Sequence, residues 1–376
     1  MSRARDIADL SSVSARLDTV GGSEGALSNR NIIINGAMQI AQRGASATGK
    51  TSAGYYTVDR FQTDIGSAGT WTFAQSSTAP DGFANSLKVD CTATQTSLSG
   101  DKYFIVQQKI EGQNLQQLKF GTSNALPITL SFYVKSNKTG TYHLNFYNTD
   151  NARQNGKTYT IDAANTWEQK TISLDGDTAQ GFTNDNNESF MLEWWLVAGT
   201  TYTSGSVPTA WQAHTNADRA AGQSVNLADS TSNEWLITGV QLEVGNTATP
   251  FEHRSFAEQL RLCQRYFSKS YAYATAIGAS TGAGMRQTDY EENNQGAGYR
   301  EKYDFQFPVE MRAAPSITIY DSSGNSGKCN YYMGSSSTPN KTLTLPPANT
   351  RQFGGYSDRA TTIGGWATHY TADAEL

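Results

Sequence analysis

Charged side chains are scarce in this 376-residue chain. They make up 17% of it, with 29 Lys and Arg against 34 Asp and Glu and a formal net charge of -5, whereas soluble proteins average roughly 25% charged residues. Ser, Thr, Asn, Gln and Gly fill the shortfall, so the surface is polar but weakly charged. A nucleic-acid-binding protein gathers Lys and Arg on one face to neutralise phosphates. The composition therefore argues against nucleic acid as a partner.

Long apolar runs are also missing. The longest, residues 191–198, contains Glu193 and is far shorter than the roughly 20 residues of a membrane-spanning helix. Near the amino terminus, Asp6 and Asp9 stand where a secretory signal peptide has an apolar stretch. We therefore expect no membrane insertion and no signal peptide, and a protein made and assembled in a cytoplasm.

Cysteine and histidine are few and dispersed. The three cysteines are Cys91, Cys263 and Cys329. Their odd number and wide spacing exclude a disulfide framework and a CxxC metal motif, so we predict three reduced, buried thiols. None of the four histidines has a second His or Cys at metal-ligand spacing. The sequence thus predicts no metal site built on His or Cys.

An acidic loop leaves one alternative open for a cofactor. Its carboxylates are Asp175, Asp177, Asp185 and Glu188. Oxygen ligands of this kind suit calcium, but the spacing fails the EF-hand pattern. A solvated turn is the favoured interpretation, and we predict no cofactor, with calcium as the alternative.

Short segments with alternating apolar residues follow one another through most of the chain. The predicted strands are 31–40, 55–65, 70–75, 86–92, 103–110, 128–135, 141–147, 167–174, 190–197 and 234–244, and, later, 303–309, 316–320 and 341–345. Turn residues separate them, for example at 138–140, 154–157 and 175–177. Parallel sheets need helical crossovers, which are missing here. We predict a mainly β protein, with an antiparallel jelly-roll sandwich followed by a smaller β-domain.

Two helices complete the predicted organisation. Apolar residues recur at helical spacing near the amino terminus, at Ile7, Leu10, Val13, Leu17 and Val20. A helix this short must pack on something else, either as an anchoring or oligomerising segment or on its own domain. The second helix, at 255–268, has a capping box formed by Ser255 and Glu258. The predicted parts are an anchoring segment (1–30), a jelly roll (31–254), a linking helix (255–270) and a Tyr- and Gly-rich β-domain (271–376).

Catalytic motifs are matched by letters but not by context. Residues 44–51, GASATGKT, fit the phosphate-binding P-loop pattern. That loop requires a preceding buried strand and a following helix, whereas residues 52–58 lead into a predicted strand. No pair of carboxylates stands out for glycoside hydrolysis, although sequence distance cannot exclude one. We predict no catalytic residues and no enzymatic activity.

Aromatic residues form the more informative set. Trp194 and Trp195 are adjacent in a predicted strand and must point to opposite faces, so at least one is expected outside the core. An exposed aromatic ring is a suitable stacking platform for a sugar because it offers apolar area at low entropy cost. Core packing is the competing interpretation for each of these residues. The candidate carbohydrate-binding residues are Trp195, Trp211, Tyr331, Tyr332, Tyr356 and Trp366.

Several segments, in order along the chain, carry a resemblance to a known group of proteins. They are NRNIIINGAMQIAQRG (29–44), YTVDRF (56–61), WLITGVQLEVG (235–245), PFEHR (250–254), LRLCQRYF (260–267), MRAAP (311–315) and ADAEL (372–376). Together they resemble tail-fibre and related virion proteins of bacteriophages. The resemblance implies a jelly roll similar to carbohydrate-binding modules and a structural or adhesive role. It also implies a homotrimer that joins other virion proteins through its amino terminus and reaches the host surface with the other end.

These expectations combine into a first hypothesis, a virion fibre or receptor-binding protein that contacts host-surface glycans. Three linked copies would turn weak single contacts into useful avidity. The alternative is an architectural virion protein, such as a capsid fibre, decoration or connecting protein, without a receptor of its own. A glycan-degrading enzyme ranks last.

Overall fold

The computed structural model describes residues 29–287, 300–333, 336–358 and 365–376. The predicted amino-terminal helix, with Ile7, Leu10, Val13, Leu17 and Val20, lies outside the described residues. The chain forms two compact units. Among the described residues, the first contains 29–39, 46–56 and 61–254, and the second contains 40–45, 57–60 and the described part of the chain from 255 to 376.

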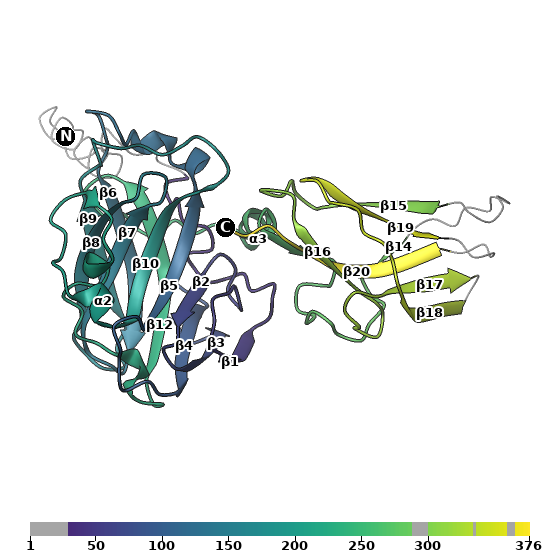
Figure 1. The fold of residues 1–376 in the computed structure, drawn as a ribbon, viewed down its shortest axis with the longest axis horizontal. Helices are drawn as coiled ribbons and strands as arrows, with labels where there is room; N and C mark the ends of the chain where they lie inside the picture. The colour runs from purple at the N-terminus through teal and green to yellow at the C-terminus, as the bar shows by residue number, and fades with distance from the viewer. Residues whose placement is uncertain (1–28, 288–299, 334–335, 359–364) are drawn as a thin grey trace, which may run out of the picture. The chain divides into compact units, whose positions relative to one another are not determined.

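The first unit is a sandwich of two antiparallel six-stranded sheets (Figure 1). Sheet A has the order β1 (Ser46–Lys50), β3 (Thr70–Ser76), β4 (Ser86–Ala93), β12 (Glu234–Val244), β6 (Ile128–Ser136) and β9 (Glu168–Leu174). Sheet B has the order β11 (Gln212–Ala213), β8 (Arg153–Ile161), β7 (Gly140–Asn148), β10 (Glu188–Ala198), β5 (Tyr103–Glu111) and β2 (Gln62–Gly66). Neighbours in sequence thus often lie in different sheets, as the predicted jelly roll requires.

Large aromatic side chains fill the space between the sheets. Trp71 of β3 lies 4.4 Å from Phe104 of β5, and Phe132 of β6 lies 5.9 Å from Trp194 of β10, measured between ring centroids. All four side chains are completely buried. Each pair joins one sheet to the other, so alternate residues of these strands form the core and the intervening residues face outward.

Most predicted strands of the sandwich are confirmed, and the exceptions have local causes. Residues 31–40 are not a strand, since Asn35 and Met38 have positive φ angles. Of 55–65, only 62–65 is strand, because Arg60 also has a positive φ. The predicted turn at 154–157 is wrong, because these residues lie within β8. The P-loop-like segment forms the edge strand β1, with no helix after it, as its context predicted.

The second unit is a smaller β structure. Its strands are β13 (Phe267–Lys269), β14 (Arg286–Gln287), β15 (Arg300–Gln306), β16 (Ser316–Tyr320), β17 (Cys329–Met333), β18 (Ser336–Lys341), β19 (Gln352–Asp358) and β20 (Gly365–Asp373). Strand β20 pairs with β13, β14, β16 and β17, while β15 pairs with β19 in a separate two-stranded sheet of the described residues. The prediction of a strand at 341–345 is wrong beyond Lys341, whereas 316–320 is confirmed. The core gathers Met311, Phe353 and Tyr370.

Helix α3 (Phe256–Gln264) falls inside the range in which the sequence predicts a linking helix, and it belongs to the second unit. The Ser255 hydroxyl accepts a hydrogen bond from the Glu258 amide at 3.2 Å, which confirms the N-cap bond of the predicted capping box. The three cysteines are buried free thiols, as predicted.

A buried ionic cluster joins the separate segments of the second unit. Arg43 contacts Glu375 at 3.2 Å and Asp373 at 3.0 Å, and Arg60 also pairs with Glu375. Both guanidinium groups lie over aromatic rings, Arg43 over Phe267 and Arg60 over Tyr266. Charges this well buried are tolerated because each has an opposite charge beside it.

Candidate functional site

The outward face of sheet B is covered by the chain itself. Residues 199–225, here called the covering segment, contain α2 (Thr200–Thr203) and β11, which pairs with β8. Glu193 of β10 is completely buried and binds both Arg219 of the covering segment and Asn145 of β7. This face is therefore closed by specific polar contacts.

Trp195 lies under the covering segment and not on the surface. Its indole is completely buried, with the Tyr202 ring 5.0 Å away and the Arg219 guanidinium 5.0 Å above it. The expectation that Trp194 or Trp195 lies outside the core is thus wrong for both, because the covering segment buries the outward one. Trp195 cannot serve as an exposed stacking platform.

A buried histidine lies in the same covered face. His143 of β7 makes a 2.8 Å hydrogen bond through Nδ1 with the carbonyl of Ala221. Burial lowers the pKa of His143 to about 4, although the Ala221 carbonyl and the carboxylates of Glu193 and Asp218 act in the opposite direction. The imidazole is therefore neutral at pH 7, with Nδ1 as the donor.

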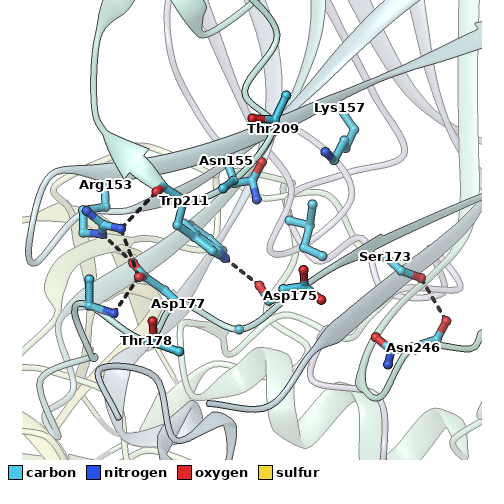
Figure 2. Close-up of a pocket in the computed structure, with 14 residues that line it drawn as sticks. Arg153, Asn155, Lys157, Ser173, Asp175, Asp177, Thr178, Thr209, Trp211 and Asn246 are labelled. Carbon is cyan, nitrogen blue, oxygen red and sulfur yellow. Dashed lines mark hydrogen bonds and ion pairs between the residues drawn. The ribbon is translucent and has the colours of Figure 1, made fainter. Parts of the chain in front are cut away.

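A cleft of about 270 Å³ opens beside β8 and β9, at one edge of the sandwich (Figure 2). It is lined by Arg153, Asn155, Lys157, Ser173, Leu174, Asp175, Gly176, Asp177, Thr178, Ala179, Thr209, Ala210, Trp211 and Asn246. These residues come from β8, from β9 and the loop after it, from the covering segment and from the loop after β12. Hydroxyl, amide, ammonium and carboxylate groups thus converge around one large aromatic ring.

Trp211 provides that ring, and its position is fixed. The indole N–H donates a 2.7 Å hydrogen bond to the carbonyl of Asp175, so the ring spans from the covering segment to the loop after β9 (Figure 2). The Trp211 and Phe120 rings pack edge to face, with their centroids 5.5 Å apart. The side chain remains half-buried, which leaves part of the ring free. The sequence names Trp211 as a candidate carbohydrate-binding residue, and the structure places it half-buried in this cleft.

An ion pair holds the floor of the cleft. Arg153 binds the buried carboxylate of Asp177 with two hydrogen bonds of 2.5 and 3.0 Å, and donates a third to the carbonyl of Trp211 at 3.1 Å. Asp177 also accepts from the Ala179 amide. A bidentate Arg–carboxylate pair has one preferred geometry, so it fixes the two loops relative to β8.

Free polar groups remain in the cleft. Asn155 is 3% exposed, and its side-chain oxygen has no hydrogen-bond partner among the described residues. The Asp175 carboxylate is exposed, since the hydrogen bond to Trp211 uses its main-chain carbonyl. Lys157 reaches only a 3.4 Å contact with the carbonyl of Pro208. The Asp175 carboxylate and the Lys157 ammonium can bind hydroxyl groups without breaking strong contacts within the protein.

The acidic loop uses much of its charge internally. Asp177 is paired with Arg153, Glu188 lies 2.8 Å from Lys109, and Asp185 accepts from Asn187. Among the described residues, no three His, Cys, Asp or Glu side chains are grouped so that they could hold a metal ion. Within the same residues, no helix is long and apolar enough for a membrane span.

The aromatic candidates of the second unit lie on its sheets. Tyr331 of β17 and Trp366 of β20 are cross-strand neighbours with ring centroids 5.0 Å apart, and both are half-buried. Trp366 also packs on the core. Tyr332 follows on the opposite side of β17 and is half-buried, and Tyr356 lies on β19 in the separate β15–β19 sheet. Within the predicted set, Tyr331 and Trp366 are in ring contact.

Sequence reasoning missed the residues of β8 that line the cleft. Arg153, Asn155 and Lys157 stand at alternate positions and therefore share one face of the strand. Their spacing of two residues is typical of a strand, but Asn155-Gly156 has the composition of a turn, so the sequence predicts a turn at 154–157.

Comparisons with known proteins give weak structural likenesses only. No protein-family model and no curated protein sequence matches the chain. A family 11 carbohydrate-binding module of a cellulosomal cellulase from Clostridium thermocellum overlaps with a TM-score of 0.27 and 11% identity, covering 54% of this chain and 99% of that one. A family 61 module in complex with β-1,4-galactotriose overlaps with a TM-score of 0.28 and 8% identity, covering 58% of this chain and 100% of that one. Tailspike protein 4 of bacteriophage CBA120 gives 0.29 and 11%, covering 57% of this chain but only 21% of the tailspike chain. Overlaps this weak do not support an inference about function, which must come from the residues of the site.

Proposed function

We propose that this protein is a bacteriophage virion fibre protein whose first unit binds host-surface glycans in the cleft around Trp211. The observation that carries the glycan part is the half-buried Trp211 ring, fixed by its hydrogen bond to Asp175 and surrounded by free polar groups. A sugar ring has an apolar C–H face and a rim of hydroxyl groups. An aromatic face beside amide, hydroxyl and carboxylate groups matches both features.

The charges of the cleft favour a neutral glycan. Arg153 is neutralised by its bidentate contact with Asp177, and Lys157 shares the cleft with the exposed carboxylate of Asp175. Binding should therefore depend little on ionic strength, because no net charge attracts an acidic sugar.

The virion role rests on the resemblance of the segments at 29–44, 56–61 and 235–254 to phage fibre proteins. In this proposal three copies assemble, the amino-terminal segment joins other virion proteins, and the protein has no catalytic activity. Light scattering of the purified protein tests the assembly. A trimer is expected, and a monomer would contradict this part of the proposal.

A glycan array probed with the full-length protein tests the binding function. We expect Trp211→Ala to weaken binding to the best array glycan about tenfold, which corresponds to about 1.4 kcal/mol. Asp175→Ala should weaken it several-fold while leaving the main-chain contact to Trp211 in place. Tyr332→Ala, in the second unit, is the control and should bind normally.

The outcomes separate the candidate roles. If no array glycan binds the unmodified protein, the glycan-binding function is wrong and an architectural role takes its place. If Tyr332→Ala weakens binding and Trp211→Ala does not, the site lies in the second unit. Circular dichroism of each variant confirms that the sandwich is folded.

A further inference from the structure

A second cleft, of about 400 Å³, opens in the same unit. It is lined by Leu115, Gln116, Lys119, Phe120, Thr122, Asn124 and Phe182. Most of these residues belong to the loop between β5 and β6, and Phe182 belongs to the loop between β9 and β10. The latter loop also supplies residues 175–179 of the first cleft. The two clefts therefore share one loop.

Aromatic side chains form the wall between the clefts. Phe120 packs edge-on against Trp211 at 5.5 Å and stacks on Phe182 at 5.2 Å with an interplanar angle of 24°. Beneath them, the completely buried Phe190 contacts Trp211 at 6.1 Å and Phe182 at 5.3 Å. Trp211 and Phe182 are both half-buried. Trp211 in the first cleft and Phe182 in the second thus pack on the same two buried rings, Phe120 and Phe190.

Close backbone packing keeps this wall rigid. The Gly121 amide donates a 2.7 Å hydrogen bond to the carbonyl of Asp177. A Cβ on Gly121 would lie 2.5 Å from the Gly181 nitrogen, and one on Gly181 would lie 2.7 Å from the Phe120 carbonyl oxygen. The Gly181 carbonyl also accepts from Asn148 and Asn151. Only glycine allows the two loops to come this close, so the distance between the clefts is fixed before a ligand binds.

We infer that the protein binds an oligosaccharide chain that occupies both clefts, with one sugar stacked on Trp211 and another on Phe182. This inference rests on the proposed glycan-binding function. The first cleft alone falls below the roughly 300–1,000 Å³ of typical ligand pockets, and the second lies near the lower end of that range. A ligand that is bound at Trp211 and buries most of its surface must therefore extend from the first cleft into the second. The binding unit is then an internal stretch of a glycan chain and not a single terminal sugar.

Linking two weak subsites through one ligand predicts a dependence on chain length. Once one sugar is bound, the next contact is intramolecular, so affinity should rise steeply when the chain becomes long enough to reach the second ring. Further lengthening should add little.

The test measures affinity by calorimetry for a series of one to six sugar units of the array glycan that the unmodified protein binds best. We expect Phe182→Ala to bind the longest oligomer about tenfold more weakly than the unmodified protein and the single sugar equally well. Trp211→Ala should weaken binding to every member. Phe83→Ala is the matched control, because Phe83 is half-buried in the same unit and contacts Tyr133 and Phe251.

Phe182→Leu keeps the apolar volume but removes the flat face, so it tests stacking even if Phe182→Ala fails to fold. Affinity that does not change with chain length, or equal effects of Phe182→Ala and Phe83→Ala, would overturn the two-cleft inference. Either result can occur while Trp211→Ala still weakens binding about tenfold, in which case the proposed function stands and only its extension fails.

Discussion

Lowering the pH from 7 to 4 should destabilise the first unit through His143. This side chain is completely buried beneath the covering segment and keeps a neutral ring, with a pKa of about 4 against 6.5 for an ordinary histidine. In the unfolded chain the same histidine takes up a proton near pH 6.5. Folding then requires the loss of that proton, so stability falls as the pH drops below 6.5 and levels off below about 4.

The size of this effect follows from the difference between the two pKa values. At 1.36 kcal/mol for each pH unit, the change from 6.5 to about 4 is worth about 3 kcal/mol of unfolding free energy. That is a large fraction of the stability of a typical domain, which is roughly 5–15 kcal/mol.

Urea unfolding followed by tryptophan fluorescence measures this contribution. Trp71, Trp194, Trp195 and Trp235 are all completely buried in the first unit and report on it. His143→Asn can still donate to the Ala221 carbonyl but cannot titrate, so its unfolding free energy should fall less than that of the unmodified protein between pH 7 and pH 4. His253→Gln, at an exposed position, is the control. An identical pH dependence for the unmodified protein and His143→Asn would refute the reasoning.

Three further predictions concern the stability of the two units. Arg219→Met should cost about 3–5 kcal/mol of unfolding free energy in urea, because it leaves the buried Glu193 carboxylate unpaired; adding Glu193→Leu should recover most of the loss. Gly181→Ala should lower stability by about 1–3 kcal/mol, because the new methyl group meets the Phe120 carbonyl, and thermal melting measures it. Ser255→Ala should cost about 1 kcal/mol of unfolding free energy in the second unit, through loss of the α3 cap, measured by calorimetric melting of the full chain. If the Arg219→Met/Glu193→Leu double variant is less stable than Arg219→Met, the argument about the unpaired carboxylate is wrong. An unchanged melting temperature for Gly181→Ala would contradict the steric argument. An unchanged unfolding transition of the second unit in Ser255→Ala would contradict the role of the cap.

The sequence carries most of the sandwich but little of the candidate site. Strands such as β6 and β7 have clean alternation because one face meets the core, and that period is a local property of the chain. Trp195 is buried because the covering segment packs on the outward face of sheet B, where Arg219 pairs with Glu193. No local pattern predicts such a return.

The cleft could not be predicted from the sequence because the fold brings its residues together from separate parts of the chain. Trp211 could be chosen because it is a tryptophan in a long loop, but its partners come from four separate parts of the chain. Asn155 and Gly156 have the composition of a turn, yet tertiary pairing places them in the middle of β8. In the second unit, β20 pairs with four strands, and none of those pairings follows from residue type alone.

The second unit also has a property that affects how the protein can be divided for study. Residues 61–254 are inserted into its sequence, between Arg60 and the segment that begins at Ser255. A fragment starting at Ser255 would keep Glu375 and the contact of Arg312 with its main-chain carbonyl, but it would lose Arg43 and Arg60, which contact its carboxylate. The two groups joined by the Arg43–Glu375 contact are 332 positions apart, so in the unfolded chain they must close a very long loop. Prior folding of the inserted sandwich would shorten that loop, so we expect the sandwich to fold before the Arg43–Glu375 contact forms.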